Sequence, residues 1–196
     1  AAGEAQIAAA IAAHMGRIGL DVHIEEVAPG RPNVIGVLEG RAPGRSLMFC
    51  GHVDTVGIEG MDAPFTPELR SGRLYGRGSQ DMKGGVAAMI DAARMVAERG
   101  LASGRLIVAA VVDEEYASIG ADALVRNWTA DGAVVTEPTD LQVGPWKLEI
   151  LDARNAVARA IATAERDPTR PVVIADTQDN PGAGGDSNTT GMLHEL

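Results

Sequence analysis

Apolar runs that end in acidic residues place the strongest constraint on the fold of this 196-residue chain. The run Leu106–Val112 contains seven apolar residues, and Asp113, Glu114 and Glu115 follow it directly. An uninterrupted run of this kind is typical of a strand that is covered on both faces, as in α/β sheets. Open α/β sheets place their functional sites at the carboxyl ends of such strands. The acidic residues therefore mark a candidate site.

Two further segments repeat this arrangement. An apolar run within Ser46–Thr55 breaks at a His-x-Asp motif, and the run Ala133–Val135 leads to Glu137. An imidazole that binds a metal needs an acceptor for its second ring nitrogen, and Asp54 is spaced to serve His52 in this way. Any one of these acids alone is more typical of a solvated loop carboxylate. Their repetition at successive strand ends favours a shared metal site.

Asp81 completes this set of candidate ligands. It lies in the glycine-rich segment Gly72–Gly85, directly ahead of a helical pattern. The apolar residues of that pattern share one helical face: Val86, Met89, Ile90, Ala93 and Val96. The pattern predicts that this face packs in the core and that the Asp81 carboxylate lies at a loop-to-helix transition.

In this order the motifs resemble the dinuclear zinc amidohydrolases and exopeptidases, which include acetylornithine deacetylase, succinyl-diaminopimelate desuccinylase, aminoacylase and the glutamate carboxypeptidases. The resemblance covers about residues 3–143. It rests on five segments: Gly51–Thr55, Pro64–Phe65, Gly76–Gly85, Asp113–Glu115 and Glu137–Thr139. The fold that it implies is a partial zinc-exopeptidase catalytic domain that lacks the lid domain.

The resemblance also assigns roles to the candidate residues. It implies that His52 and Glu137 bind one metal ion, that Glu115 binds the other and that Asp81 bridges the two. Glu114 is then the general base that acts on the bridging water. The resemblance implies Asp54 as the partner that orients the imidazole, and a cis Asp81–Met82 peptide bond.

The residue types fit hydrolysis by two metal ions. Such ions lower the pKa of a shared water and polarise the scissile carbonyl group. Glu114, if uncoordinated, can take the proton of the water and pass it to the leaving amine. Mixed histidine and carboxylate ligation suits zinc, with cobalt or manganese as alternatives. The sequence therefore predicts a metal-dependent hydrolase of amide bonds in N-acyl amino acids or small peptides.

The chain departs from this family at both ends. The family's further metal-binding histidine, and the histidine and substrate-carboxylate contacts of its lid domain, are not recognisable here. His194 lacks the family's flanking pattern, and we interpret His14 and His23 as surface residues. The family usually has another helix before Gly3, so we expect truncation at the front, with processing after a signal peptide as the alternative.

These departures leave one half of the metal site complete. We predict one divalent ion at His52, Asp81 and Glu137, and a weaker or missing second ion because that half lacks its histidine. The competing hypothesis is a catalytically incompetent fragment that folds, binds at most one metal ion and serves as an interaction module. Metal content measured together with hydrolysis of N-acetyl amino acids distinguishes the two.

Residues 144–196 form a separate tail in the sequence. The pattern predicts a helix, the short strand Val172–Ile174 and the polar glycine-rich loop Asp176–Thr190. The stretch from about residue 155 to 196 resembles the C-terminal end of the microcystinase (MlrC-like) metallopeptidases, and this resemblance transfers no metal role.

An isolated strand of three residues is not stable, so we expect Val172–Ile174 to join the same sheet as Leu106–Val112. The loop would then lie beside the metal residues, where Asp179 or Asp186 could replace the missing histidine as an oxygen ligand. An anion-binding loop, a site for a hard cation at Asp176, Asp179 and Asp186, and a plain strand-to-helix connection are the alternatives.

The composition argues against several classes of partner. There are 17 Lys and Arg against 27 Asp and Glu, and the net charge of −10 argues against nucleic acid and anionic membrane partners. No apolar run approaches the length of a membrane span. The single Cys50 excludes an internal disulfide and is interpreted as a small core residue.

We therefore expect a cytoplasmic α/β protein with a doubly wound or mixed sheet and helices on both faces. Residues 1–143 would form the partial catalytic domain, and residues 144–196 would form a tail that completes the same sheet. The helices are predicted near residues 4–18, 84–98, 119–128 and 153–165.

Overall fold

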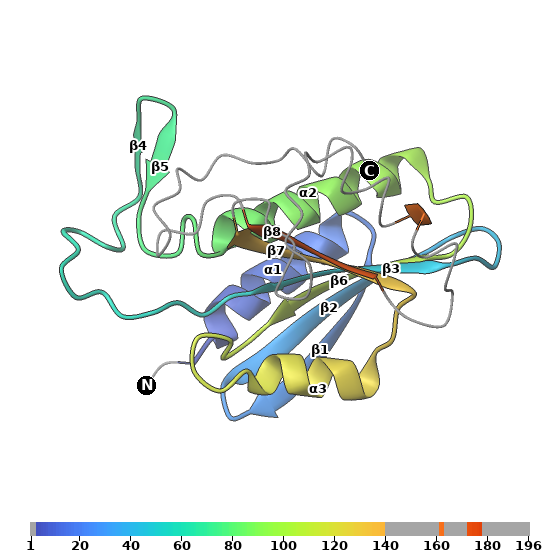
Figure 1. Cartoon of the computed structure of the whole chain (residues 1–196), viewed down its shortest axis with the longest axis horizontal. Coiled ribbons are helices and arrows are strands. Elements are labelled where there is room, and N and C mark those ends of the chain that lie inside the picture. Colours follow the sequence, from blue (N-terminus) through green and yellow to red (C-terminus); the bar gives the residue numbers. More distant parts are fainter. Residues whose placement is uncertain (1–2, 140–160, 163–171, 178–196) are drawn as a thin grey trace.

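The computed structural model describes residues 3–139, 161–162 and 172–177, and these form a six-stranded mixed sheet and a separate hairpin (Figure 1). The strands of the large sheet, in spatial order, are β1 (Asp21–Ala28), β2 (Arg31–Glu39), β6 (Arg105–Val111), β3 (Ser46–His52), β7 (Gly132–Thr139) and β8 (Val172–Thr177). The first three strands pair antiparallel, and β6, β3, β7 and β8 run parallel. This confirms the predicted mixed α/β sheet.

Helices cover both faces of the sheet, as predicted. The helices α1 (Ala5–Arg17) and α2 (Lys83–Arg99) pack on one face, and α3 (Ile119–Asn127) packs on the other (Figure 1). The bounds agree with the predicted helices to within a residue or two. The fourth predicted helix, at residues 153–165, lies outside the described residues except for residues 161–162, which are helical. No described helix is both long and apolar enough to cross a membrane.

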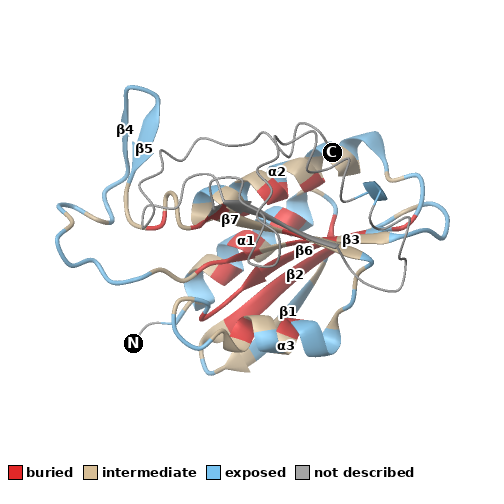
Figure 2. Cartoon of the chain, in the orientation of Figure 1, coloured by how far each residue is buried: buried red, intermediate tan, exposed pale blue. Residues whose placement is uncertain are grey.

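The apolar run that dominates the sequence forms β6 and its first following residue. From Leu106 to Val112 every residue is buried, and alternate side chains contribute to the cores on the two faces of the sheet. Figure 2 shows the buried positions concentrated in the central strands and on the inner sides of the helices. Burial on both faces explains why this strand carries no alternation of polar residues.

The strand Val172–Ile174 was predicted to join this sheet, and the structure confirms it. The longer strand β8 pairs parallel with β7, with Val172 opposite Gly132 and Ile174 opposite Val134. The loop was predicted to begin at Asp176, which was wrong because Asp176 and Thr177 belong to β8. The rest of that loop, with Asp179 and Asp186, lies outside the described residues, as does His194. The proposed division of the chain near residue 144 also stays a prediction.

The sequence analysis did not predict a second small sheet. The connection between β3 and α2 contains the hairpin β4 (Glu68–Arg70) and β5 (Arg73–Tyr75), which projects from the body of the molecule in Figure 1. Ser71 and Gly72 both have positive φ angles, of 52° and 78°, at the turn of this hairpin. Its side chains are exposed, so apolar periodicity gave no signal for these strands.

The start of α2 lies close against β7. A Cβ atom on Gly85 would come within 2.4 Å of the Thr136 carbonyl oxygen, which no side chain can tolerate without movement. Glycine at this position therefore allows the amino end of α2 to approach the sheet edge. This close packing brings the residues just before α2, among them Asp81, next to the carboxyl ends of β3 and β7.

Candidate metal centre

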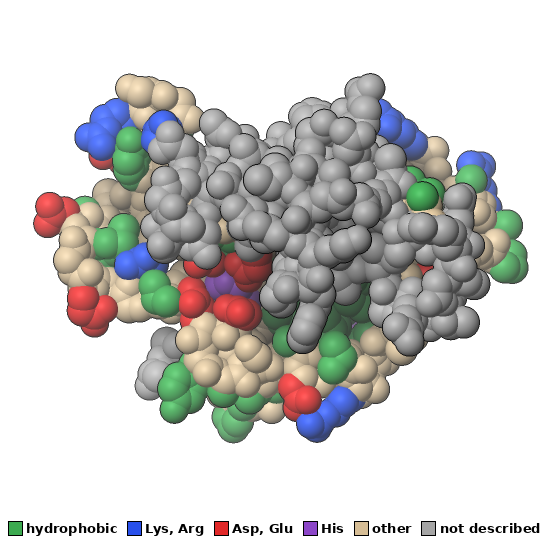
Figure 3. Space-filling view, in the orientation of Figure 1, with side chains coloured by type: hydrophobic (Ala, Val, Ile, Leu, Met, Phe, Trp, Pro, Cys, Tyr) green, Lys and Arg blue, Asp and Glu red, His purple; other side chains and the backbone are tan. Residues whose placement is uncertain are grey.

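Three predicted ligands converge at the carboxyl ends of the parallel strands. His52, the last residue of β3, is 1% exposed, and its Nε2 lies 3.0 Å from Asp81 Oδ1 and 3.4 Å from Glu137 Oε1. One ligand atom from each of the three side chains lies within 4.8 Å of the others. Figure 3 shows acidic side chains gathered around a histidine on this surface. The structure thus brings together the half-site that the sequence analysis described as complete.

The backbone positions each member of this group. Asp81 precedes α2, and the Asp81–Met82 peptide bond is cis, as the family resemblance implied. Met82 is fully buried beneath the site, with its sulfur 3.1 Å from the His52 backbone nitrogen. Glu137 lies inside β7 and not after its end, because the strand continues to Thr139 beyond an irregularity in its pairing with β8.

Asp54 fixes the direction of the imidazole. His52 Nδ1 lies 3.3 Å from Asp54 Oδ1 and 3.2 Å from the Asp54 carbonyl oxygen. The Asp54 carboxylate also accepts hydrogen bonds from the backbone amides of Glu114, at 3.1 Å, and Glu115, at 3.0 Å. When Nδ1–H donates to Asp54, the Nε2 lone pair points toward Asp81 and Glu137. The geometry is therefore that of a ligand imidazole held by a carboxylate partner.

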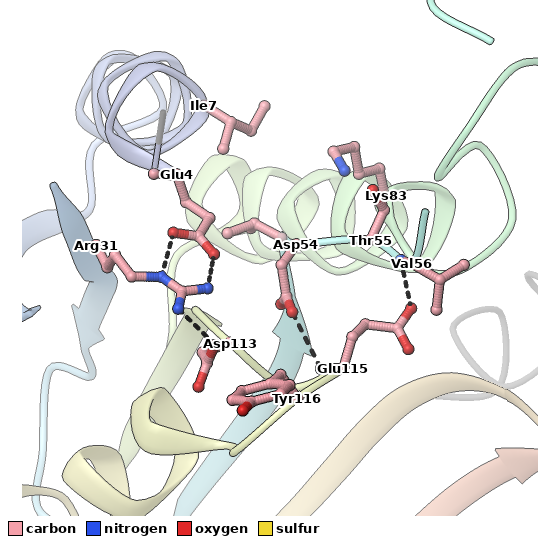
Figure 4. A pocket seen from close by; sticks show the side chains of 12 residues that line it. Glu4, Ile7, Arg31, Asp54, Thr55, Val56, Lys83, Asp113, Glu115 and Tyr116 are labelled. Atoms are coloured by element: carbon pink, nitrogen blue, oxygen red, sulfur yellow. Dashed lines mark hydrogen bonds and ion pairs between the residues drawn. The ribbon is translucent and has the colours of Figure 1, made fainter. Parts of the chain in front are cut away.

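The two adjacent glutamates occupy different surroundings. The Glu114 side chain is 43% exposed, and its Oε2 lies 3.7 Å from His52 Nε2. Glu115 is not part of the three-residue group, and its Oε1 accepts a hydrogen bond of 3.3 Å from the Val56 amide (Figure 4). Burial, followed by the charge of Asp81, raises the pKa of Glu115. The role of Glu115 as a ligand of a second ion stays a prediction.

Burial and charge together shift the pKa values at this site. Burial lowers the pKa of His52, but the carboxylates of Asp54, Asp81 and Glu137 outweigh it and raise the pKa to about 10. Burial raises the pKa of Glu137 to about 7, against the opposing charge of His52. Burial also acts to raise the pKa of Asp54, but His52 and the two backbone amides lower it to about 2. Without a metal ion, the group therefore holds protons at neutral pH.

The three side chains fit a divalent cation. A histidine nitrogen and carboxylate oxygens are zinc ligands, and two ligand atoms at about 2.1 Å from a tetrahedral ion lie about 3.4 Å apart. The separations of 3.0 Å and 3.4 Å from His52 Nε2 agree with this arrangement. The raised pKa of the buried Glu137 carboxylate also favours a cation that takes the place of its proton.

A cavity of about 440 Å³ adjoins this centre on the side of Asp54 (Figure 4). Its charged lining includes Arg31, Lys83 and Glu115. Burial lowers the pKa of Lys83, while the charges of Asp54 and its acidic neighbours act in the opposite direction. Sequence reasoning did not single out Arg31 or Lys83. Lys83 lies within the glycine-rich motif, whereas no local pattern marks Arg31, which follows the turn after β1.

The remaining candidates from the sequence behave as expected where the structure describes them. His14 and His23 are exposed on α1 and β1. Cys50 is half-buried in β3 against the core on the α3 side, and burial raises the pKa of its thiol to about 12. The interpretation of Cys50 as a packing residue is therefore confirmed.

Comparison with known proteins identifies the family. Residues 48–181, more than half of the chain, match the profile of peptidase family M20/M25/M40. The chain belongs to this family. The match extends past residue 143, where the predicted resemblance ended, and the resemblance of the tail to microcystinases stays a prediction.

Two curated M20 relatives are N-formyl-4-amino-5-aminomethyl-2-methylpyrimidine deformylase from Bacillus subtilis and acetylornithine deacetylase from Photorhabdus laumondii. The first is 35% identical over 141 residues, which is 68% of this chain and 33% of the relative. The second is 38% identical over 138 residues, which is 67% of this chain and 35% of the relative. This M20 chain spans about a third of the length of these relatives.

A solved structure shares the fold. Aminopeptidase PepT from Bacillus cereus aligns with a TM-score of 0.58 and 26% identity, over 72% of this chain and 39% of that one. The likeness covers most of this chain but only part of the other, which agrees with the predicted partial catalytic domain.

Proposed function

We propose that this M20 chain is a metal-dependent hydrolase of amide bonds in N-acyl amino acids or small peptides. The observation that carries the proposal is the convergence of His52, Asp81 and Glu137 at the carboxyl ends of parallel strands. Family membership supports it, and so do the names of the two relatives, a deformylase and a deacetylase. The acidic surroundings of the site also favour small amide substrates over nucleic acid.

The proposed ligand set follows the geometry. His52, Asp81 and Glu137 hold one divalent ion, and zinc is the proposed metal, with cobalt or manganese as substitutes. Asp81 has a second carboxylate oxygen that can bridge to another ion, and Glu115 is the proposed ligand of that ion. One oxygen of the Glu115 carboxylate accepts a hydrogen bond from the Val56 amide, and the proposed role uses the other oxygen.

Bound metal supplies two things, a lower pKa for the attacking water and polarisation of the scissile carbonyl. The protein residues carry out the proton transfers. Glu114 lies beside the ligand group without belonging to it, and it is the proposed general base. Its carboxylate takes a proton from the water whose oxygen attacks the carbonyl carbon. It then donates that proton to the nitrogen as the C–N bond breaks, which yields the carboxylic acid and the free amine.

Asp54 supports this chemistry without contact with substrate. By accepting the Nδ1–H of His52 it keeps Nε2 as the electron-pair donor, and partners of this kind raise the basicity of a ligand imidazole. Its hydrogen bonds with the amides of Glu114 and Glu115 hold the base and the ligand group at a fixed separation.

Hydrolysis by the full chain tests the proposal. The protein is loaded with zinc, cobalt or manganese and incubated with N-acetyl amino acids, N-formyl amino acids and dipeptides, and the released amine is measured by a fluorogenic reagent. Glu114→Gln should reduce the rate by about 10²–10⁴-fold while metal content is kept, because only the proton transfer is lost. Glu98→Gln, at the far end of α2, is the matched control and should keep full activity.

Metal binding without release of amine from any of these substrates would contradict the proposed hydrolase. That outcome would support the competing hypothesis, a fragment that folds and binds a metal ion without turnover. Equal loss of activity in the Glu114 and Glu98 variants would remove the role proposed for Glu114.

A further inference from the structure

The strand β2 holds both ends of the loop that carries the two glutamates, which we call the acidic loop (residues 113–118). Asn33, in β2, is fully buried. Its Nδ2 donates a hydrogen bond of 2.8 Å to the Gly120 carbonyl oxygen, and its Oδ1 accepts one of 3.1 Å from the Val112 amide. The Gly120 amide in turn donates to the Val112 carbonyl oxygen at 3.2 Å. The two flanks of the acidic loop are therefore tied to one side chain.

Arg31 holds the acidic loop from within. It is the first residue of β2 and lies two residues before Asn33. Arg31 Nη1 lies 2.5 Å from Asp113 Oδ1, and Arg31 Nε and Nη2 bind the two carboxylate oxygens of Glu4 (Figure 4). One guanidinium thus joins the start of α1 to the first residue of the acidic loop.

Asp113 needs this partner. Its side chain is only 3% exposed, and a buried carboxylate is costly unless it is paired. Its φ angle is +62°, a left-handed conformation that is unfavourable for most residues other than glycine, asparagine and aspartate. Its carbonyl oxygen accepts hydrogen bonds from Ser118, at 2.6 Å, and Ala117, at 3.3 Å, which close the turn. Without the guanidinium, hydration of the carboxylate would compete with this turn.

The turn fixes the residues that follow. The amides of Glu114 and Glu115 come directly after Asp113, and both donate to the Asp54 carboxylate that lies against His52 Nδ1. A continuous set of contacts therefore runs from Arg31 through the acidic loop to the imidazole.

We propose that Arg31 is a positioning residue: its ion pair with Asp113 sets the acidic loop so that the Glu114 and Glu115 amides hold Asp54 against His52. The effect on metal binding rests on the proposed function, whereas the effect on the acidic loop does not. The ion-pair partners of Arg31 in the described part of the chain are Glu4 and Asp113, neither of which is a proposed ligand, and Arg31 acts through Asp113.

A different role for Arg31 predicts different results. If Arg31 only anchors α1 through Glu4, then Glu4→Gln should reproduce the effect of Arg31→Met. If Arg31 positions the acidic loop, Asp113→Asn should reproduce it and Glu4→Gln should not. Asparagine suits this comparison because it tolerates the left-handed conformation and removes only the charge.

Hydrogen exchange of the metal-free full chain gives the first readout. In Arg31→Met and Asp113→Asn, the amides of Glu114 and Glu115 should exchange faster than in the unchanged protein, and the double variant should be no faster than the stronger single variant. Arg105→Met removes the exposed ion pair with Glu39 at the opposite end of β6 and should leave these amides unchanged.

Cobalt(II) binding gives the second readout. Arg31→Met should weaken cobalt affinity by about 10-fold, which is the lower end of the loss seen when a residue that supports a metal ligand is replaced. It should also alter the visible absorption of the bound ion. Arg31→Lys keeps the charge and should recover part of the affinity and of the exchange protection. This lysine variant is also the one to examine if the methionine variant fails to fold.

Unchanged exchange at Glu114 and Glu115 in Arg31→Met or Arg31→Lys, with faster exchange in α1 alone, would overturn the positioning role. If a folded variant shows faster exchange of the Glu114 and Glu115 amides but an unchanged cobalt affinity and spectrum, the proposed effect of the acidic loop on His52 would be overturned. Failure of the unchanged protein to bind cobalt would count against the proposed metal centre, and the exchange result would still decide on the acidic loop.

Discussion

Replacing Asp54 by asparagine should weaken divalent-metal binding by about 10- to 100-fold. Asp54 makes three contacts that matter for the site, with Nδ1 of His52 at 3.3 Å and with the amides of Glu114 and Glu115 at 3.1 Å and 3.0 Å. Asparagine keeps one acceptor oxygen and places an NH₂ group where the second oxygen was. That NH₂ group faces either a backbone N–H or the imidazole Nδ1–H, and neither arrangement is favourable.

The structure sets the size of the effect. A tenfold to hundredfold loss of affinity corresponds to about 1.4–2.8 kcal/mol. The loss of affinity follows from the contact of Asp54 with His52 Nδ1, which orients the ligand imidazole. A hydrogen bond to a charged group contributes about 1.5–3 kcal/mol, so the loss of one amide contact should lower the free energy of unfolding of the metal-free protein by about that amount. The variant should therefore be examined at a temperature where it is fully folded.

Competition between the protein and a chromophoric chelator for zinc measures the affinity. The matched control is Asp21→Asn, because Asp21 lies 3.3 Å from Nε2 of His23 in an exposed pair far from the candidate centre. This control should bind zinc as the unchanged protein does. A folded Asp54→Asn protein with the unchanged zinc affinity would refute the argument that Asp54 orients a ligand imidazole.

Three further predictions follow from the same geometry. The pKa of His52, about 10, and that of Glu137, about 7, both exceed their ordinary values, whereas the pKa of Asp54, about 2, lies below its ordinary value. The stability of the metal-free protein should therefore be greatest near pH 4.5, should fall as pH rises from there to about 10 and should also fall below about pH 4; thermal unfolding that is constant or improves from pH 4.5 to 10 would contradict it. Zinc must displace these protons, so its stabilising effect should grow over the same range, and calorimetry in buffers of different ionisation enthalpy should detect proton release at pH 7. Gly85→Ala should destabilise the protein by about 1–3 kcal/mol in denaturant unfolding, because its Cβ would meet the Thr136 carbonyl oxygen at 2.4 Å. In the control Gly16→Ala, the added Cβ has no atom within 4 Å, and this variant should stabilise α1. Equal effects of the two substitutions would show that α2 adjusts freely.

Much of the fold was predictable from patterns with a direct physical cause. The run Leu106–Val112 predicted a strand covered on both faces, and the stripe beginning at Val86 predicted the buried side of α2. Both signals arise from burial. The hairpin β4–β5 lies exposed at the surface, so its strands carried no such signal, and the turn residues alone did not reveal it.

The candidate centre was predictable for a different reason. His52 ends β3, Asp81 precedes α2 and Glu137 follows the apolar run of β7, and parallel strands bring such positions to one edge of the sheet. Arg31 and Asn33 could not be recognised in this way, because their importance depends on β2 pairing antiparallel with β6. Local sequence does not specify that neighbour. The actual bounds of β7 were also missed, since the strand runs through Glu137 instead of ending before it.

Zinc content is the most direct test of the central claim, which is that His52, Asp81 and Glu137 bind a divalent ion. The full chain is saturated with zinc, dialysed and analysed for zinc per protein molecule, beside His52→Ala and the surface control His14→Ala. We expect at least one zinc ion per molecule in the unchanged protein and in His14→Ala, and a clear loss of zinc in His52→Ala. Absence of zinc from the unchanged protein, or full retention of zinc in folded His52→Ala, would contradict it.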